Sequence, residues 1–399
     1  MPVGTPFHER TFALCESLSY RDWSGYYTVS NYETHHEHEY NAIRNAAALI
    51  DISPLFKYVV SGPDAARLVD RMITRNVRTM DVGQVFYTPW CDEHGAVIDD
   101  GTVARLEEDR FRWTSADPSL RWITQNTTGL RVSVDEVSEA TAALALQGPM
   151  AARVLRACAD ANVDALRYFR ITRGRIAGVP VEISRTGYTG DLGYEMWIPS
   201  EHAVQVWDAI MTAGQPFELK PVGMLALDVA RTEAGLLLLD VDYIGSRKAL
   251  IPAQRYTPFE MGLSRLVSLD KGPFVGRAAL VEERRRGPRR MVVGLEIEWA
   301  DVEALYERVG LTPVAPAATS RVPVPVFRSA RQIGRATTTA WSPTLKRLIA
   351  MATIDAPHYE HGTRVEFEIT VEGARHFAGA KVVQTPFFNP SRKTATPPL

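Results

Sequence analysis

Gly187-Tyr188-Thr189-Gly190-Asp191-Leu192-Gly193-Tyr194-Glu195 is the stretch of this chain from which the fold can be inferred. Its three glycines separate two apolar runs, 179–184 and 194–198, that are typical of β-strands. Glycines at this density permit positive φ angles and let another body approach the backbone closely. Glu195 then enters an apolar strand, where a carboxylate is costly to bury without hydrogen-bond donors. The stretch is therefore either a long hairpin loop with a carboxylate at its rim, or a ligand loop whose glutamate binds a planar, N–H-rich group.

Length and composition indicate a globular chain of two or three domains. The 399 residues exceed one ordinary core, and 45% hydrophobic with 23% charged residues is usual for soluble proteins. A net charge of −2 gives no support to a nucleic-acid-binding or membrane-attracted surface. The three cysteines are widely spaced, which argues against a disulfide framework, and no apolar run is long enough to span a membrane. Because the chain also starts without a secretory signal pattern, we expect a cytoplasmic protein.

Periodicity along the chain predicts alternating strands and helices, followed by a β-rich end. A capping box at 34–37 predicts a helix that runs through Ile43 and Leu49. The charged segment 282–290, broken by Gly-Pro, is our predicted linker. After it, alternating patterns such as 293–299 predict about six strands with little helix, and 389–399 is expected to be a tail.

A cluster of histidines at the start of the predicted helix raises the question of a metal site. His35, His36 and His38 lie close together, but no cysteine or second histidine pair is spaced to complete a ligand set. Histidines on a helix surface are the commoner case, so no metal is expected.

Several common catalytic patterns are absent from the sequence. There is no dinucleotide-binding glycine motif, P-loop or nucleophile elbow. What remains is carboxylates in apolar settings, above all Asp99 and Asp100 after the turn at Gly95. Adjacent residues of a strand point to opposite faces, so at most one of the two is expected to face a given site. They either end a strand by accepting backbone N–H groups or act as an acid, a base or a stabiliser of a cationic centre.

Five segments together resemble the glycine-cleavage T-protein (aminomethyltransferase) superfamily. The stretch 187–195 resembles its G-Y-T-G-E-x-G-[FY]-E signature, and 95–100 resembles its G-G-x-I-D-D turn and strand. The segment 145–149 (Ala-Leu-Gln-Gly-Pro) is similar to a further marker, and 231–235 (Arg-Thr-Glu-Ala-Gly) to the helix end R-L-E-A-G. The segment 333–345 is similar to the barrel motif that ends in S-P-T-L. The order and intervals agree along almost the whole chain.

This resemblance implies a tetrahydrofolate-dependent one-carbon transferase of the α+β class, with three domains in a cloverleaf and a C-terminal antiparallel β-barrel. By family analogy the first domain combines residues 1–53 and 142–246. The second combines 54–141 and 247–290, and the barrel takes 291–399.

The resemblance also implies roles for individual residues around folate in a central channel. Glu195 would accept hydrogen bonds from the pterin N3–H and 2-amino groups, because both carboxylate oxygens accept in one plane. Tyr188 would line the channel, and Arg231 would belong to the cofactor-binding residues. Asp99 would be the catalytic residue, facing the reactive N5/N10 region and stabilising developing positive charge.

The aromatic N-terminal segment is expected to shape the pocket for a small-molecule substrate. We assign Tyr26 and Tyr27 to this pocket, together with Asp100.

The chain departs from the family pattern at positions that bear on its activity. Leu227 replaces an arginine that is a cationic folate contact in family members, and 100–103 (Asp-Gly-Thr-Val) looks more like folate-dependent demethylase relatives. We therefore expect a demethylase-like transferase that moves a methyl or aminomethyl-type carbon between folate and a small N-, O- or S-linked compound. The alternatives are a genuine aminomethyltransferase acting on lipoyl carrier protein, and a folate-binding regulatory module without turnover.

Overall fold

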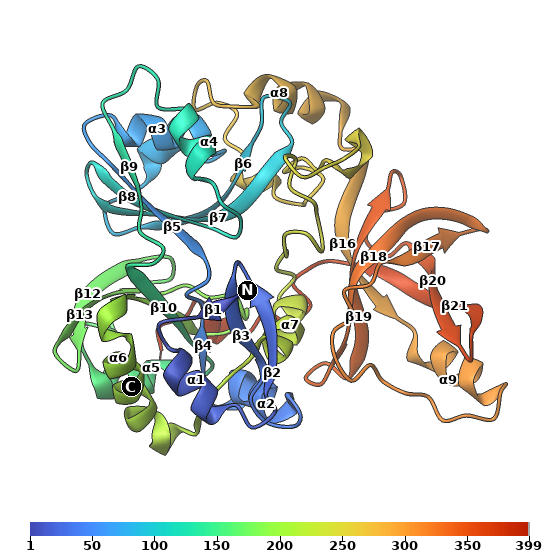
Figure 1. Ribbon diagram of the computed structural model, residues 1–399. Coiled ribbons are helices and arrows are strands. Elements are labelled where there is room, and N and C mark those ends of the chain that lie inside the picture. The colour runs from blue at the N-terminus through green and yellow to red at the C-terminus, as the bar shows by residue number, and fades with distance from the viewer. Residues whose placement is uncertain (398–399) are drawn as a thin grey trace.

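The computed structural model, which describes residues 1–397, shows three lobes, with helix α7 (Met224–Glu233) between the first lobe and the barrel (Figure 1). Helices and sheets mix in two of the lobes, and the third is a barrel, so the predicted α+β cloverleaf with a C-terminal barrel is confirmed. The domain boundaries expected from the sequence stay a prediction. None of the helices within residues 1–397 is long and apolar enough to cross a membrane, and the expected cytoplasmic location also stays a prediction.

The first lobe is built on a seven-stranded sheet covered by two helices. Its order is β11-β12-β13-β14-β10-β4-β15, and α5 (Ala151–Cys158) and α6 (Ala203–Gly214) pack on its apolar face. The apolar residues of α6, which repeat with a helical period, are buried in this core. The strands are β4 (Ala47–Asp51), β10 (Thr141–Gln147), β11 (Ala159–Asp160), β12 (Ile171–Ile176), β13 (Val179–Ser184), β14 (Gly193–Pro199) and β15 (Leu219–Pro221).

The N-terminal segment forms a small sheet beside the first lobe. Strands β1 (Val3–Gly4), β3 (Tyr26–Asn31) and β2 (Ser19–Trp23) pair in that order. In the sequence, helix α1 (His8–Leu14) lies between β1 and β2, and helix α2 (Glu37–Asn45) follows β3.

The second lobe is a five-stranded antiparallel sheet with helices on it, in the order β6-β7-β8-β5-β9. Strands β6 and β7 form a hairpin, and its turn at Gly95 has a φ of 76° that favours glycine. The elements are β5 (Phe56–Ser61), α3 (Ala65–Met72), β6 (Val85–Cys91), β7 (Val97–Glu107), β8 (Arg110–Ser115), α4 (Leu120–Gln125), β9 (Ser133–Glu136) and α8 (Arg277–Arg286).

The third lobe is a closed barrel in which six strands pair as β16-β19-β18-β17-β20-β21. Closure leaves no unpaired sheet edge, and alternate side chains fill the interior. The strands are β16 (Arg290–Ile297), β17 (Val324–Arg328), β18 (Arg331–Ser342), β19 (Arg347–Asp355), β20 (Arg364–Val371) and β21 (Ala374–Val383).

Two local predictions near the N-terminus are wrong. Helix α2 begins after His36, which makes no side-chain cap, so the expected capping box does not form. The helix ends before Ala46, and Leu49 lies in strand β4, where it pairs with Leu146 and Pro221. Alternate residues of β4 lie in separate cores on the two faces of the sheet, so the strand is apolar throughout and its period does not distinguish it from a buried helix.

The linker and one strand end are also corrected by the structure. Helix α8 runs through Arg286 and β16 starts at Arg290, so only 287–289 connect them. Trp299 does not extend the strand but starts α9 (Trp299–Glu307), where its ring lies 4.9 Å from that of Trp341.

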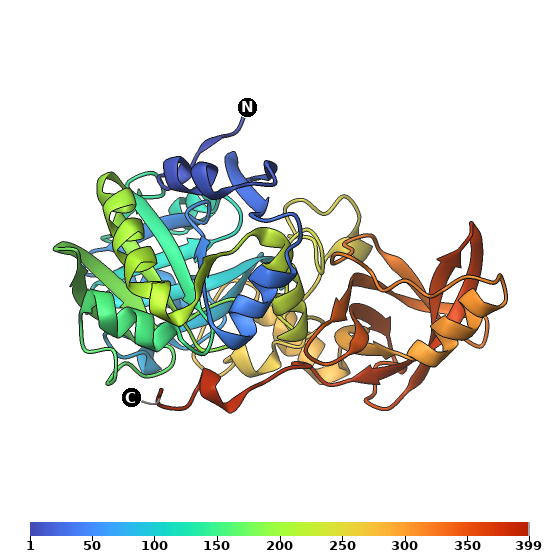
Figure 2. The same cartoon turned by 90° about the horizontal axis from the view of Figure 1, so that it is seen from below.

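The C-terminal segment is not a free tail. It returns from the barrel to the first lobe, as Figure 2 shows along its lower edge. Arg392 Nε lies 2.7 Å from Asp191 Oδ1, and Arg185 Nη2 donates to Lys393 O at 3.3 Å. The predicted tail therefore packs on the first lobe as far as residue 397, and residues 398–399 lie outside the described part.

Candidate functional site

The glycine loop is shaped by contacts with two other motifs. A Cβ at Gly187 or Gly193 would lie 2.1 Å or 2.2 Å from Oε1 of Gln147. Gly190 has a φ of 72°, and a Cβ there would lie 2.4 Å from the Cβ of Ala234 at the end of α7. The bodies that approach this backbone are thus a glutamine and an alanine of the same chain.

Gln147 ties the two arms of the loop together. Its Nε2 donates to the carbonyl oxygens of Thr186 at 3.3 Å and Tyr194 at 3.4 Å, and its Oε1 accepts from Thr189 Oγ1 at 2.8 Å. The side chain is completely buried. Because these bonds span both arms, Gln147 fixes where the loop delivers Glu195.

Glu195 leaves this loop on β14 with half of its carboxylate unpaired. Thr186 Oγ1 donates to Oε2 at 2.6 Å, while Oε1 accepts no hydrogen bond from residues 1–397. The side chain is partly exposed. Burial raises the pKa of Glu195, and the Thr186 hydrogen bond and nearby Arg112 oppose that rise. An acceptor in this state can bind a donor from a ligand.

Tyr188 lies between the loop and the middle of the molecule. Its hydroxyl donates to the carbonyl oxygen of Leu237, and its ring packs on the cluster that contains Leu227. Burial raises the pKa of Tyr188, and its charged neighbours include Arg231 and Asp100. The structure therefore brings Tyr188 close to two other residues singled out from the sequence.

Asp99 is fully buried on β7 and holds backbone groups. Its Oδ1 accepts from Asp100 N at 2.8 Å, and its Oδ2 accepts from the N–H groups of Ala116 at 3.1 Å and Asp117 at 3.0 Å. Burial and the charge of Asp100 raise the pKa of Asp99 well above its usual value, against those N–H donors. This is the strand-ending arrangement that the sequence left open beside the catalytic one.

Asp99 and Asp100 meet at one hydroxyl group, contrary to the expected opposite faces. Tyr243 Oη donates to Asp100 Oδ1 and lies 3.4 Å from Asp99 Oδ1, and Tyr87 also hydrogen-bonds to Asp100. Burial raises the pKa of Asp100. The pairing of β6 and β7 shifts between Asp99 and Val97, and such a bulge re-aims neighbouring side chains.

Arg231 is a buried link between α7 and the barrel. Its Nη1 donates to Asp242 Oδ2 at 2.6 Å, and its Nη2 donates to Thr338 Oγ1 at 3.0 Å. The side chain is completely buried, and Asp242 Oδ1 also accepts from Thr338 at 2.7 Å. The expected contact of Arg231 with a cofactor stays a prediction.

Positive charge gathers beside Leu227, from segments far away in the sequence. Asp228 is 5% exposed and accepts from Arg21 Nη1 at 3.3 Å and from Arg321 Nη2 at 2.6 Å. Arg21 comes from β2 and Arg321 from the segment before β17. Burial lowers the pKa of Arg21, and Arg321 lowers it further. One carboxylate between two guanidinium groups leaves a net positive charge.

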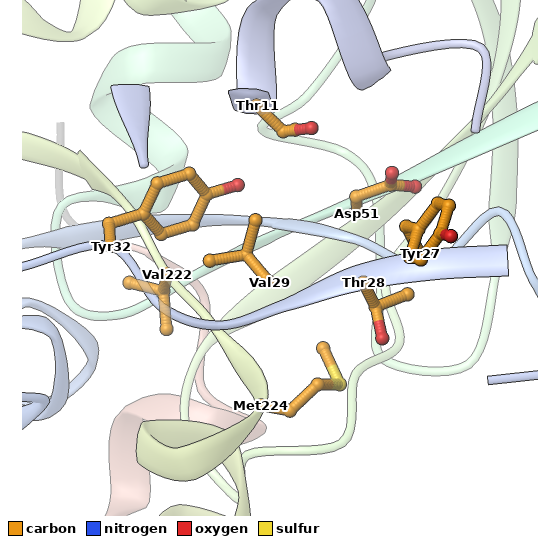
Figure 3. Close-up of a pocket in the computed structure, with 8 residues that line it drawn as sticks. All are labelled: Thr11, Tyr27, Thr28, Val29, Tyr32, Asp51, Val222 and Met224. Atoms are coloured by element: carbon orange, nitrogen blue, oxygen red, sulfur yellow. The ribbon is translucent and has the colours of Figure 1, made fainter. Parts of the chain in front are cut away.

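The structure places Tyr27 in a separate small cavity of about 10 Å³, which holds roughly one water molecule. Figure 3 shows Tyr27 beside the carboxylate of Asp51 in this cavity. No hydrogen bond or ring contact within residues 1–397 joins Tyr26 or Tyr27 to Asp99 or Asp100. Their expected place in the substrate pocket stays a prediction.

The histidines that raised the metal question have other neighbours. His38 Nδ1 lies 2.6 Å from Glu33 Oε2, and His36 lies near Asp228. In the part of the chain that the structure describes, no three His, Cys, Asp or Glu side chains are grouped so that they could hold a metal ion.

Several residues of this site escaped the sequence analysis. Tyr87, Tyr243 and Asp242 surround the aspartate pair, and Arg21 and Arg321 bind Asp228. They come from different lobes, and none lies in a segment with a distinctive spacing. These residues can be recognised as part of the site only from their proximity in the structure.

Comparison with known proteins assigns the chain to a family. Residues 9–271 match the family model of the GCVT N-terminal domain, and residues 307–389 match the glycine cleavage T-protein C-terminal barrel domain. The chain belongs to the glycine cleavage T-protein family. The resemblance stated from the sequence is thereby confirmed, as is the prediction of a transferase-family enzyme.

Curated relatives of this T-protein family member carry two different names. It is 34% identical over 406 residues to the trimethylamine-oxide aldolase of Ruegeria pomeroyi, covering 98% of the chain and 48% of that protein, or about half its length. It is 34% identical over 359 residues to the aminomethyltransferase of Moorella thermoacetica, covering 89% and 90%. The aminomethyltransferase of Streptomyces coelicolor is 36% identical over 350 residues, with coverages of 86% and 87%.

A solved structure confirms the T-protein fold. The glycine cleavage system aminomethyltransferase T from Bartonella henselae superposes with a TM-score of 0.81 over 98% of the chain and 99% of that structure. At 23% identity, this match speaks for the fold alone.

Proposed function

We propose that this protein is a tetrahydrofolate-dependent one-carbon transferase of the demethylase type, acting on a small N-, O- or S-linked substrate. The observation that carries the proposal is the Glu195 carboxylate, which the glycine loop presents with one oxygen unpaired. The family membership and the trimethylamine-oxide aldolase relative support it.

The free oxygen of Glu195 fits the donors of a pterin. A pterin offers N3–H and its 2-amino group side by side, and a carboxylate accepts such a pair in one plane. Thr186 uses one lone pair of Oε2, at 2.6 Å, so that Oε1 and the second lone pair of Oε2 can both accept from the pterin. Because burial raises the pKa of Glu195, donors from a ligand would stabilise its charged form. Tyr188, held by Leu237, would flank the same ring system.

Arg21 and Arg321 supply positive charge where Leu227 has none. Folate ends in a glutamate, whose carboxylates are suited to guanidinium groups. Asp228 neutralises one charge of the pair, so the other is left for a ligand. Arg231 would act through Asp242, by holding the segment that carries Tyr243.

The aspartate pair would carry the chemistry. Bound tetrahydrofolate supplies the nitrogen that exchanges the carbon. Asp99, fixed by three backbone N–H groups, would stabilise positive charge on the substrate heteroatom as its bond to that carbon breaks or forms. Asp100 and Tyr243 would hold a proton close to the pair, since the Tyr243 hydroxyl is within reach of both carboxylates.

Calorimetric titration with tetrahydrofolate tests the proposal. The wild-type protein should bind, and Glu195→Gln should bind roughly 10- to 100-fold more weakly, the loss expected for a hydrogen bond to a charged group. Glu201→Gln, at an exposed glutamate before α6, is the matched control and should bind like the wild type. Absence of binding, or equal affinity of the Glu195 and Glu201 variants, would refute the proposal.

A second candidate function is supported by the aminomethyltransferase relatives, which match over nearly their full length. The protein would then act on aminomethyl-loaded lipoyl carrier protein and release ammonia when tetrahydrofolate is present. Ammonia release would establish this candidate, and its absence would exclude it. If the protein binds folate but transfers no carbon from either substrate class, the remaining alternative is a folate-binding regulatory module without turnover.

A further inference from the structure

A second, larger pocket is lined by Ile98, the residue before Asp99, and by Asp117, which donates to Asp99. Its volume is about 300 Å³, at the small end for ligand sites, and Ile98, Asp117, Arg121, Arg247 and Lys248 are among its lining residues.

One loop is shared by this pocket and Asp99. The N–H of Asp117 donates to Asp99 Oδ2 at 3.0 Å, while Asp117 itself lines the pocket. On the other wall, Gly245 passes so close to β7 that a Cβ would lie 2.5 Å from Ile98 O. The loop that fixes the Asp99 carboxylate is therefore also a wall of the pocket.

The pocket carries more positive than negative charge. Lys248 Nζ lies 2.5 Å from both Asp117 Oδ2 and Asp240 Oδ2, so these three side chains already bind one another. Arg121 and Arg247 form no hydrogen bond or ion pair with any residue from 1 to 397, and Arg247 lies only against the ring of Trp122, at 5.8 Å. Arg121 and Arg247 are thus without an anionic partner. Together with Lys248 they carry three positive charges, against two negative charges on Asp117 and Asp240, so the net charge is one positive.

We propose that this pocket binds the carboxylate of the one-carbon substrate, so that the substrate is a small monocarboxylic acid. The proposal rests on the proposed function and adds a substrate class to it. Guanidinium groups bind a carboxylate through paired N–H donors, and Arg121 and Arg247 have all of theirs available. A single surplus charge matches a monoanion, whereas a dianion such as phosphate would leave negative charge beside Asp117. The rest of a small acid would lie against Ile98 and Gly245, next to Asp99.

Ligand binding without folate tests the pocket separately from the cofactor site. Methoxyacetate and N,N-dimethylglycine carry a methyl group and one carboxylate, and 2-methoxyethanol is the matched uncharged compound. Titration followed by NMR should show that the two acids bind the full-length protein, that 2-methoxyethanol does not, and that inorganic phosphate binds more weakly than either acid.

Variants then locate the site. Arg121→Gln with Arg247→Gln should weaken binding of the acids at least about tenfold, because two charged donors are lost. Arg284→Gln, at an exposed arginine of α8, is the control and should bind like the wild type. Unchanged binding in the double variant, equal binding of 2-methoxyethanol, or tighter binding of phosphate would each overturn the proposal.

The cofactor is measured in parallel. The double variant should keep wild-type affinity for tetrahydrofolate. Acid binding without tetrahydrofolate binding would refute the proposed function and leave a carboxylate site, while tetrahydrofolate binding without acid binding would refute this inference alone.

Discussion

At the residue scale, neighbouring Asp99 and Asp100 have different tasks. Asp99 accepts three backbone N–H groups, two of them on a single oxygen, whereas Asp100 accepts from the side chains of Tyr243 and Tyr87. A backbone N–H cannot turn away from a lost acceptor, but a tyrosine hydroxyl can donate equally well to an amide oxygen. The same substitution should therefore cost more at Asp99 than at Asp100.

Asp99→Asn replaces one of the two accepting carboxylate oxygens by an NH₂ group, which cannot accept a hydrogen bond. Whichever way the amide is turned, at least one buried N–H loses its acceptor, which costs about 1–3 kcal/mol. Burial raises the pKa of both aspartates, so Asp100→Asn is the reference, and Asp99→Asn should be less stable than Asp100→Asn in urea unfolding at neutral pH. Equal stability of the two variants would show that the backbone N–H groups do not depend on Asp99.

Asp100→Asn should make the protein more stable at neutral pH. Burial raises the pKa of Asp100 in the folded state, so its contribution to stability is fully present below the unfolded pKa and is lost as the pH rises through the folded value. An asparagine has no such loss. Unfolding curves of the two proteins should coincide at acidic pH and separate as the pH rises, with the variant the more stable. A difference of the opposite sign would contradict the raised pKa.

At the scale of elements, the glycine loop, the end of β10 and the end of α7 form one unit. Sequence reasoning predicted that another body approaches the glycines, and it also marked 145–149 and 231–235 as motifs. It could not show that Gln147 and Ala234, within those two segments, are the approaching bodies. That requires side-chain contacts between residues about 40 positions apart, which no local spacing encodes.

Gly193→Ala should destabilise the protein through Gln147. The new Cβ would lie 2.2 Å from Gln147 Oε1 and would displace its hydrogen bonds to both arms of the loop, at a cost of about 1–3 kcal/mol of unfolding free energy. A double-mutant cycle with Gln147→Ala isolates the contact. The second substitution removes the clashing group, so the combined loss should be smaller than the sum of the single losses. Strict additivity would contradict a clash between these two side chains.

Elements were predicted best where they show a clean period. Helix α6 and the barrel strands agree with the sequence, because each has one buried and one exposed face. Predictions failed where tertiary contacts override local pattern. Leu49 is buried between two strands, and Trp299 turns into a helix that packs on Trp341. The polar segment 282–290 is half helix, although it has the composition of a linker.

At the scale of the whole molecule, the fold and the family could be predicted from the sequence, but the side-chain contacts between the lobes could not. Arg21, Asp228 and Arg321 meet although more than 200 residues separate the first two. The same holds for the contacts between the first lobe and the barrel, where one buried carboxylate acts beside the Arg231 link. Ion pairs of this kind depend on how complete lobes pack, so a single sequence carries no signal for them.

Glu233 is that carboxylate, at the end of α7. Its side chain is completely buried, and its Oε2 accepts from Arg44 Nε at 2.9 Å and Nη2 at 2.6 Å. Its Oε1 accepts from Tyr40 at 2.5 Å and from Ser342 of the barrel. The charge of Arg44, 4% exposed, is neutralised mainly here.

Glu233→Gln should therefore loosen the barrel from the first lobe. The amide is neutral and can accept on one atom only, so it leaves the buried Arg44 without a full counter-charge, which costs about 3–5 kcal/mol of unfolding free energy. Urea unfolding measures the loss, and hydrogen exchange should show faster exchange at β18 and α2 than in β5–β9 of the second lobe. Glu303→Gln, at an exposed glutamate of α9, is the control and should match the wild type. Equal stability of the two variants would mean that Arg44 and Glu233 do not hold the lobes together.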